Sequence, residues 1–115
     1  MNLDTLQKYC NKRKGVTEGF PFDEETLVFK VGGKMFCLIN LTPPWSVNLK
    51  CDPEKAIELR EEYEEITPGY HMSKKHWNTV DLHGNLKNSL IEELIDDSYN
   101  LVFARLTKKV KESLG

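Results

Sequence analysis

Strands are the clearest feature of the hydrophobic pattern. Residues 26–31 and 34–39 are rich in β-branched and aromatic side chains, which is typical of strands, and Gly32-Gly33 separates them. Because glycine readily adopts the positive φ angles of two-residue turns, these two runs predict a β-hairpin. Two further strands are predicted where polar and apolar side chains alternate, at residues 46–50 and 77–82.

Three segments show the three- and four-residue spacing of apolar positions that amphipathic helices have. They cover residues 3–13, the segment from Asp52 to Ile66, and the segment from Asn88 to Leu106, which the basic tail 108–111 follows. Asp52-Pro53 is a helix start, because aspartate caps free N–H groups and proline fits the first helical position. Gly15 and Thr67-Pro68-Gly69 are expected to end the first two helices.

The order of these elements predicts the fold class. A helix is followed by three strands, a second helix, one or two strands and a third helix, with a breaker segment at residues 19–22. We expect an α+β fold of two layers, in which helices cover one face of a mainly antiparallel sheet. A length of 115 residues corresponds to a single domain spanning residues 1–115.

Composition and charge narrow the classes of function. Sixteen basic and eighteen acidic residues give a net charge of −2, so the chain lacks the strongly basic balance of many nucleic-acid-binding domains. No apolar run reaches the roughly 20 residues of a membrane helix, and the N-terminus lacks a signal-peptide pattern. The three cysteines are odd in number and form no C-x-x-C pair, which predicts reduced thiols in a cytoplasmic protein. The missing apolar run predicts that the protein has no membrane partner. Cys37, in a predicted buried strand, is expected to be an inert packing residue.

Three histidines are candidates for metal binding or catalysis. A metal site would use His71 and His76, with His83 as a third ligand, but their spacing matches no common ligand pattern. Acid–base catalysis by His76 needs a partner that the sequence does not single out. Phosphate-loop, nucleophile-elbow and zinc-protease motifs are absent from the sequence. We therefore expect a protein that is not an enzyme and that carries no metal and no cofactor.

The segment from residue 70 to 79 has two further interpretations. In the first, His71, Lys74 and Lys75 contact nucleic-acid phosphates while Trp77 or Tyr70 stacks on or wedges between bases. In the second, the segment is structural: Trp77 fills the core, His76 fixes the loop by hydrogen bonding, and the lysines face water. The residues alone leave both interpretations open.

Two more basic clusters lie at predicted helix ends. They are Lys8, Lys12, Arg13 and Lys14, and Arg105, Lys108, Lys109 and Lys111. Six glutamates lie between Glu54 and Glu65, which is typical of a solvated helix face. Because acidic and basic residues are segregated, a nearly neutral chain can still present a basic surface. Lysine and arginine also favour helix C-termini, where they complement the helix dipole, and this explains both clusters without a partner.

Short motifs along nearly the whole chain point to a known family. They are Tyr9-Cys10, Lys34-Met35-Phe36, Val47-Asn48-Leu49-Lys50-Cys51-Asp52-Pro53, Pro68-Gly69-Tyr70-His71-Met72, Lys74-Lys75-His76-Trp77-Asn78-Thr79-Val80 and Ser98-Tyr99. With these motifs the chain resembles the MmcQ/YjbR family of small bacterial proteins. The resemblance implies a compact α+β domain, grouped with secretion-chaperone-like and frataxin-like folds. It also implies DNA binding, because family members are commonly labelled so from a "double-wing" arrangement of strands and loops.

The resemblance also bears on single positions. It marks Lys74, Lys75, His76 and Trp77 as the positions that matter most. The sequence departs from the family pattern at Ser73, where asparagine is usual, at Lys87-Asn88, which replaces a Pro-Asp helix start, and at Thr107, which replaces a proline. Asn88 and Thr107 can both cap helices, so the expected fold is unchanged.

These observations lead to three hypotheses of function. The first is a non-enzymatic cytoplasmic protein that binds DNA, with double-stranded DNA as its partner, through the side chains of His71, Lys74, Lys75, His76, Trp77, Lys108, Lys109 and Lys111. The alternative is a chaperone-like module that binds a protein or peptide, has no nucleic-acid role and recruits a basic partner with its acidic helix. The third is an enzymatic or small-molecule-binding role for the region from His71 to His76.

Overall fold

One antiparallel sheet organises the molecule. The computed structural model describes residues 1–43, 45–69 and 72–114. Its helices are α1 (Leu3–Asn11), α2 (Pro53–Glu62), α3 (Asn88–Ala104) and α4 (Lys108–Ser113), and its strands are β1 (Val16–Gly19), β2 (Thr26–Val31), β3 (Lys34–Asn40), β4 (Ser46–Lys50), β5 (Ile66–Pro68) and β6 (Trp77–Asp81). The six strands follow the order β1-β2-β3-β4-β6-β5, and each neighbouring pair is antiparallel.

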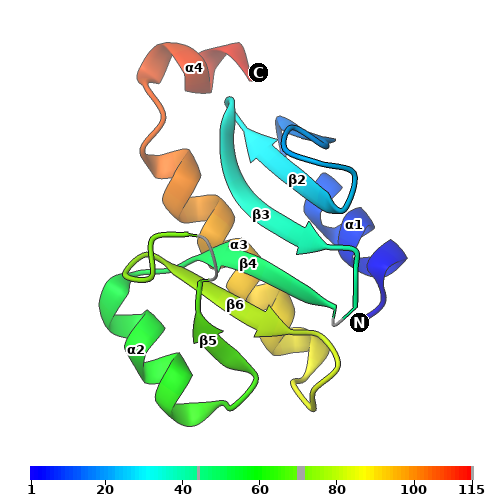
Figure 1. Ribbon diagram of the computed structural model, residues 1–115. Helices are drawn as coiled ribbons and strands as arrows, with labels where there is room; N and C mark the ends of the chain where they lie inside the picture. Colours follow the sequence, from blue (N-terminus) through cyan, green and yellow to red (C-terminus); the bar gives the residue numbers. More distant parts are fainter. Residues whose placement is uncertain (44, 70–71, 115) are drawn as a thin grey trace.

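The helices cover one face of this sheet, which confirms the expected α+β class. α3 packs against β2, β3 and β4, and α1 and α3 both lie behind the sheet in Figure 1. α2 runs beside β5, at the end of the sheet away from β1. We call the opposite face of the sheet, towards the viewer in Figure 1, the helix-free face.

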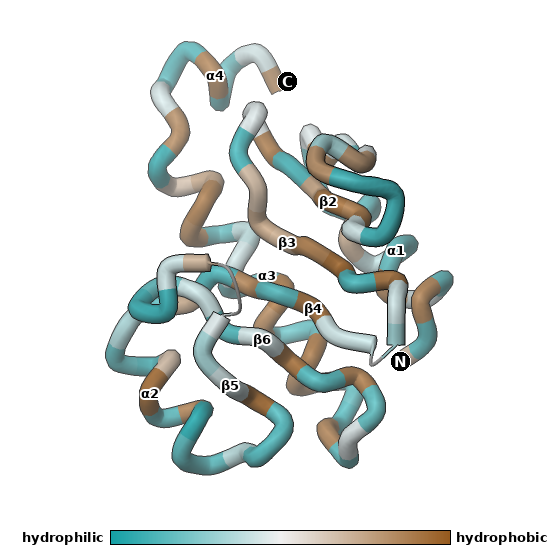
Figure 2. Tube along the Cα trace, in the orientation of Figure 1, coloured by the Kyte–Doolittle hydropathy of each residue, from teal (hydrophilic) through white to brown (hydrophobic). Residues whose placement is uncertain are grey.

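The main core fills the space between the sheet and the helices. Phe29, Phe36 and Ile39 of the hairpin and Ile95 of α3 are fully buried there, and the central strands carry the hydrophobic stretches in Figure 2. The ring of Tyr99 meets Phe36 edge-on, with 5.4 Å between the ring centroids. The predicted apolar stripe of α3 is thus confirmed as its core-facing side.

The cysteines belong to this core. Cys10, Cys37 and Cys51 are buried and free, as the sequence predicted for Cys37. The Sγ atoms of Cys10 and Cys37 lie 3.8 Å apart. Burial raises the pKa of the Cys37 and Cys51 thiols, which disfavours the reactive thiolate form.

Local signals placed the hairpin and α2 correctly. Gly32 and Gly33 have φ angles of 58° and 81°, so the turn uses the freedom that only glycine has without strain. The carboxylate of Asp52 accepts hydrogen bonds from the backbone N–H groups of Glu54 and Lys55, and Pro53 occupies the first turn. The predicted helix start is confirmed.

The predicted end of the second helix is wrong. α2 ends at Glu62, Tyr63 is extended, and Ile66 begins the short strand β5 instead of continuing the helix. Ile66 satisfies the helical spacing, yet it pairs with Val80 and is buried from the strand. Thr67 precedes a proline, which disfavours a helical backbone and favours an extended one. The strand β1, ahead of the breaker segment, was not predicted; its four residues pair with β2.

The predicted last helix is also wrong in extent. α3 ends at Ala104, and the lysines of the tail lie in a separate helix, α4, whose first free N–H groups are capped by Thr107. The Thr107 hydroxyl accepts from Val110 N at 3.2 Å, so this predicted cap is confirmed. Asn88 is not a cap: Lys87 occupies that position and makes no side-chain capping bond.

Candidate nucleic-acid interface

Most lysines lie at one edge of the sheet. In the antiparallel register, Val31 pairs with Lys34 and Lys50 pairs with Trp77, so β2 and β4 end where β3 and β6 begin. The loop before β6 and the segment before β1 reach the same edge. We call the cationic residues gathered there the basic edge: Lys14, Lys34, Lys50, Lys74, Lys75, Arg105, Lys108, Lys109 and Lys111.

α4 brings the C-terminal lysines to this edge. A β-carbon on Gly15 would lie 2.8 Å from the Leu114 side chain, and one on Gly32 would lie 2.7 Å from Leu106. The end of α1, the β2–β3 turn and α4 are therefore in contact. The chain thus brings Lys14, the last residue of the predicted cluster Lys8, Lys12, Arg13 and Lys14, to the cluster at residues 105–111. The sequence could not place the two clusters relative to one another.

Lys50 lies between the two groups of predicted phosphate contacts. Its strand neighbour is Trp77, which follows the loop lysines, and Arg105 is close enough to act on its charge. Burial, and then the positive charge of Arg105, lower the pKa of Lys50. A cation held beside another cation is stabilised by a bound anion, which makes Lys50 a candidate that the sequence analysis missed.

The helix dipole no longer explains the C-terminal cluster. That explanation required one long helix with its lysines at the C-terminal end. Lys108 and Lys109 instead open α4, where the dipole disfavours positive charge, and only Lys111 lies in the last turn. The local helix therefore gives no reason for lysines at positions 108 and 109.

The other edge of the sheet is acidic. Ser46 pairs with Asp81 there, and Thr26 pairs with Asn40, so β4 and β2 begin where β6 and β3 end. The acids that flank these strand ends form what we call the acidic edge: Asp23, Glu24, Glu25, Glu64, Glu65 and Asp81. The net charge of −2 thus hides two edges of opposite charge.

Arg60 of α2 fixes the loop that carries Lys74 and Lys75. Its Nε donates to Asn78 Oδ1 at 2.6 Å, and its guanidinium also donates to the carbonyl oxygens of Lys74 and Trp77. The side chains of Lys74 and Lys75 are exposed. The loop therefore presents two ammonium groups to solvent from a backbone that the Arg60 side chain holds. Sequence reasoning gave no signal for Arg60.

Trp77 and His76 support this loop from the inside. Trp77 is 9% exposed and packs with Val28, Leu38 and Met72 in a small cluster on the helix-free face. The His76 carbonyl accepts from the Cys51 N–H at 2.7 Å, which ties the loop to the end of β4. This placement suits Trp77 as a support of the loop and not as a residue that stacks on bases.

The histidines do not form one site. His71 lies outside the described residues, as does Tyr70. His76 precedes β6 and His83 follows it, so a five-residue strand of about 16 Å separates them and they cannot share a metal ion. Within the described ranges, no three His, Cys, Asp or Glu side chains are placed to hold a metal. The absence of a cofactor stays a prediction.

A polar cluster joins α1 to α3 and uses one of the predicted basic residues. Tyr9 Oη donates to both carboxylate oxygens of Asp96 at 2.9 Å, and Arg13 pairs with the same carboxylate. Tyr99 Oη donates to the Lys14 carbonyl at 2.6 Å. Burial, and then the hydrogen bond to Asp96, raise the pKa of Tyr9. Arg13 therefore serves the fold and is not part of the basic edge.

Replacing Tyr9 with phenylalanine tests this cluster. We expect the free energy of unfolding to fall by about 1–2 kcal/mol at pH 7, because a hydrogen bond to a charged group is lost. The raised pKa means that the contribution of the neutral phenol is complete below a pH of about 10 and is lost as the pH rises through the folded value. Urea unfolding at pH 7 and above pH 10 measures how much free energy of unfolding each protein loses as the pH rises. The variant should lose less than the unchanged protein, and equal losses in the two proteins would contradict the assignment.

The helix-free face is hollowed between two loops. The β1–β2 loop forms one wall and Met72 of the β5–β6 loop the other, and the hollow has a volume of about 470 Å³. We call it the sheet hollow; its lining residues are Phe22, Asp23, Thr26, Leu38, Asn40, Ser46, Asn48, Met72 and Thr79. Phe20 and Phe22 of the β1–β2 loop are 51% and 63% exposed. Sequence reasoning treated this segment only as a breaker. Because Gly and Pro predict a loop and loops run over the surface, its two phenylalanines were a sign of exposed aromatic side chains.

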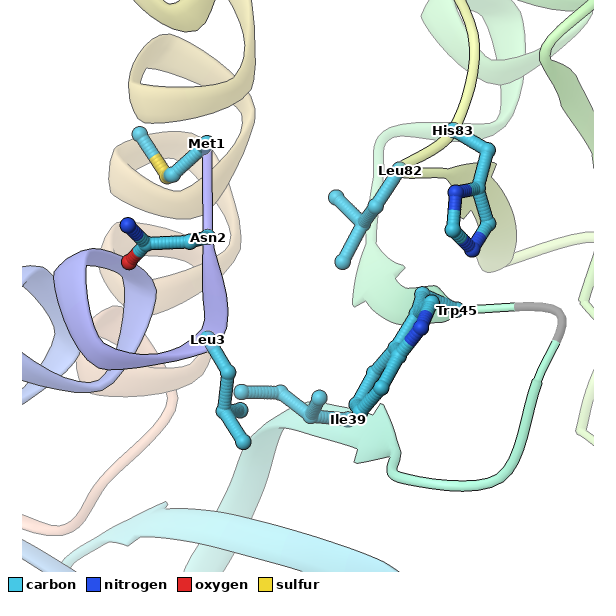
Figure 3. Close-up of a pocket in the computed structure, with 7 residues that line it drawn as sticks. All are labelled: Met1, Asn2, Leu3, Ile39, Trp45, Leu82 and His83. Carbon is cyan, nitrogen blue, oxygen red and sulfur yellow. The ribbon is translucent and has the colours of Figure 1, made fainter.

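A second, apolar pocket of about 290 Å³ lies where α1 begins. In Figure 3, Met1 and Leu3 line one side, Trp45 and Leu82 line the other, and Ile39 lies between them. The Asn2 side chain points away from the gap and caps α1 through a bond from Thr5 N. None of the described residues that line it is a lysine or arginine, so this pocket does not extend the basic edge.

A protein-family model named YjbR matches residues 12–101. This chain belongs to the YjbR family. The matched range contains the six strands and the loop lysines Lys74 and Lys75 of this chain, whereas α4 lies beyond it. The chain is similar to the uncharacterized protein YbdF of Escherichia coli O157:H7, at 44% identity over 91 residues, which cover 78% of this chain and 75% of YbdF. It is also similar to the uncharacterized protein YjbR of Escherichia coli K12, at 30% identity over 99% of this chain and 98% of that protein.

Solved structures share the YjbR-family fold. The crystal structure of the Deinococcus radiodurans protein DR2400, with a DUF419 domain, superposes with a TM-score of 0.92 at 42% identity and covers 99% of this chain and 88% of its own. A Pseudomonas syringae crystal structure superposes with a TM-score of 0.78 at 29% identity, covering 89% of this chain and 99% of that one. The fold predicted from the resemblance is confirmed. In the described part of the chain, no helix is both long and apolar enough to cross a membrane.

Proposed function

We propose that this YjbR-family chain is a non-enzymatic cytoplasmic protein that binds DNA phosphates through its basic edge. One observation carries the proposal: the loop lysines at positions 74 and 75 and the α4 lysines lie at the same edge of the sheet, with Lys50 and Arg105 between them. Phosphate contacts from lysine and arginine supply most of the affinity of non-specific DNA binding.

The arrangement favours a surface contact along a phosphate backbone. The lysines at positions 74, 75, 108 and 109 are exposed, and none of them takes part in the ion pairs of the described residues. The acidic edge at the far end of the strands repels phosphates, so it orients DNA towards the basic edge. A protein that makes six to ten phosphate contacts loses affinity for DNA by a factor of about 10³–10⁵ when the salt concentration rises from about 50 mM to about 200 mM.

Charge reversal at each end of the basic edge tests the proposal. We expect the double variants Lys74→Glu/Lys75→Glu and Lys108→Glu/Lys109→Glu each to weaken binding of a labelled random-sequence duplex by about tenfold or more at low salt. Each should also reduce the salt slope by about two, because two phosphate contacts are lost. Fluorescence anisotropy at about 50 mM and about 200 mM salt measures both quantities.

Lys87→Glu is the matched control. Lys87 is exposed and precedes α3, on the loop that leads from the acidic edge, so this variant makes the same Lys→Glu change once, with half the charge change of each double variant, at the opposite end of the molecule. We expect this variant to bind nearly as the unchanged protein does, and all variants to keep their melting temperature within a few degrees. The proposal would be overturned if both double variants bound the duplex as tightly as the unchanged protein does, or if the unchanged protein did not bind it at low salt.

Binding of a basic protein or peptide is the second candidate. The observation in its favour is the exposed acidic surface of α2, where Glu54, Glu58, Glu61 and Glu62 all face solvent. A pull-down after nuclease treatment tests it. Recovery of one stoichiometric basic partner would favour this function, and recovery of nothing would count against it.

A further inference from the structure

Apart from Asp23 at its acidic side, the residues that line the sheet hollow are uncharged, and the hollow lies between two charged edges. Its floor includes Thr26, Asn40, Ser46 and Asn48, whose side chains form hydrogen bonds without carrying charge. Asn40 Oδ1 accepts from Thr42 N at 3.2 Å, and Asn48 Oδ1 accepts from Thr79 Oγ1 at 2.5 Å. Both asparagines thus use their oxygen within the fold, while their amide N–H groups make no hydrogen bond among the residues that the structure describes. Such donors match the carbonyl and ring-nitrogen acceptors of nucleobases.

Exposed aromatic side chains border this hollow. Phe20, Phe22 and Ile57 are the exposed large hydrophobic residues of the described chain, and two of them lie on the β1–β2 loop. Phe22 lines the sheet hollow, and Phe20 lines an adjoining groove together with Lys30. Exposed aromatic rings beside lysines are the arrangement on which unpaired bases stack.

The spacing along β4 suits one nucleotide. Lys50 and Asn48 are two residues apart on the same face of the strand, a separation of about 7 Å. A phosphate at Lys50 therefore leaves the attached base at the sheet hollow. A volume of about 470 Å³ lies in the range of pockets that enclose small organic molecules, about 300–1,000 Å³.

The acids at the far side of the hollow fix the direction of such a ligand. Asp23 lines the hollow, and hydrogen bonds from the backbone N–H groups of Glu25 and Thr26 lower its pKa, so its charge is retained. Phosphate is thereby disfavoured at Asp23 and favoured at Lys50. The uncharged base is then the part of the nucleotide that fits the hollow between Asp23 and the lysine.

From this arrangement we infer that the helix-free face binds single-stranded DNA, with an unpaired base in the sheet hollow against Phe22 and its phosphate at Lys50. The inference rests on the proposed function and adds to it a preference for single strands over duplexes. In a duplex the base faces are stacked and the pairing edges are occupied, so neither Phe22 nor the asparagines can reach them. Base–aromatic stacking is independent of sequence, because each base has a π-face.

The experiment compares three labelled DNA probes of equal length. They are a single strand, the matching duplex and an abasic single strand that has the phosphates without the bases. Anisotropy at one low salt concentration is measured for the unchanged protein, for Phe20→Ala/Phe22→Ala, and for Ile57→Ala as a control. Ile57 is 53% exposed, similar to the phenylalanines, but lies on α2.

We expect the unchanged protein to prefer the single strand to both other probes. The double phenylalanine variant should lose about tenfold or more in affinity for the single strand, with its duplex and abasic binding unchanged and Ile57→Ala unaffected. Equal affinity of the unchanged protein for all three probes would overturn the inference while leaving phosphate binding intact. Absence of binding to every probe would overturn the proposed function and this inference together.

Discussion

Replacing Ser98 with alanine should destabilise this protein by about 2–4 kcal/mol. Ser98 is fully buried on α3, and its hydroxyl donates to the Phe36 carbonyl while accepting from the Lys50 N–H at 2.8 Å. The β3–β4 ladder has its last pair at Cys37 and Leu49, so Phe36 and Lys50 would form the next pair. The hydroxyl joins the two strands at the point where their backbones no longer reach each other.

The size of this loss follows from the two backbone groups that Ser98→Ala leaves without a partner, the Phe36 carbonyl and the Lys50 N–H. Each unsatisfied buried donor or acceptor costs about 1–3 kcal/mol. In a domain of this size the melting temperature should fall by about 10 °C. The change also releases the end of β4, and with it the backbone that places Lys50 at the basic edge.

Urea unfolding followed by circular dichroism measures this loss, with Ser89→Ala as the matched control. Ser89 is an exposed serine of the same helix, so its replacement should change the free energy of unfolding by less than about 0.5 kcal/mol. Hydrogen exchange gives a second readout, since the Lys50 amide should lose protection in Ser98→Ala only. A Ser98→Ala variant as stable as Ser89→Ala would show that the hydroxyl does not join β3 to β4.

Sequence signals placed the elements that are determined locally. Gly32-Gly33 and Asp52-Pro53 were sufficient for the hairpin and the start of α2, because turn and cap geometry depend on a few adjacent residues. Ile66 shows the limit of this reasoning. Its spacing fits a helix, but pairing with β6, far along the chain, makes it a strand residue. Periodicity cannot report a partner that lies at a distance in sequence.

The candidate interface was predictable only in part, for the same reason. The sequence identified Lys74, Lys75 and the C-terminal lysines as cations, but their common edge depends on the strand order β4-β6-β5 and on the break between α3 and α4. Lys50 belonged to a recognised motif but was not identified as a candidate contact, because its place depends on Arg105 and on pairing with Trp77. Ser98 belonged to a recognised motif, yet no spacing rule reveals a hydroxyl that joins two strands.

Gly69→Ala is the second large effect that we expect, and it acts on the loop of the interface. Gly69 is buried beside β6, and its N–H donates to the Trp77 carbonyl at 2.8 Å. A β-carbon there would lie 2.8 Å from Trp77 Cβ and 2.9 Å from the Trp77 carbonyl oxygen. Since backbone atoms are among these neighbours, the strands must separate, and such overpacking costs about 1–3 kcal/mol.

The displacement of Trp77 in Gly69→Ala should also affect the candidate nucleic-acid interface. Trp77 is held from one side by Gly69 and from the other by the contact between its carbonyl and Arg60, so moving it moves the backbone of Lys74 and Lys75. We expect a lower melting temperature, a red-shifted tryptophan emission and weaker duplex binding. Gly19→Ala is the matched control, because a β-carbon on this strand glycine meets nothing within 4 Å. Equal stability and emission in Gly69→Ala and Gly19→Ala would contradict the close approach of β5 to Trp77. A Gly69→Ala variant that lost stability but kept full DNA affinity would show that the loop lysines are not part of the binding surface.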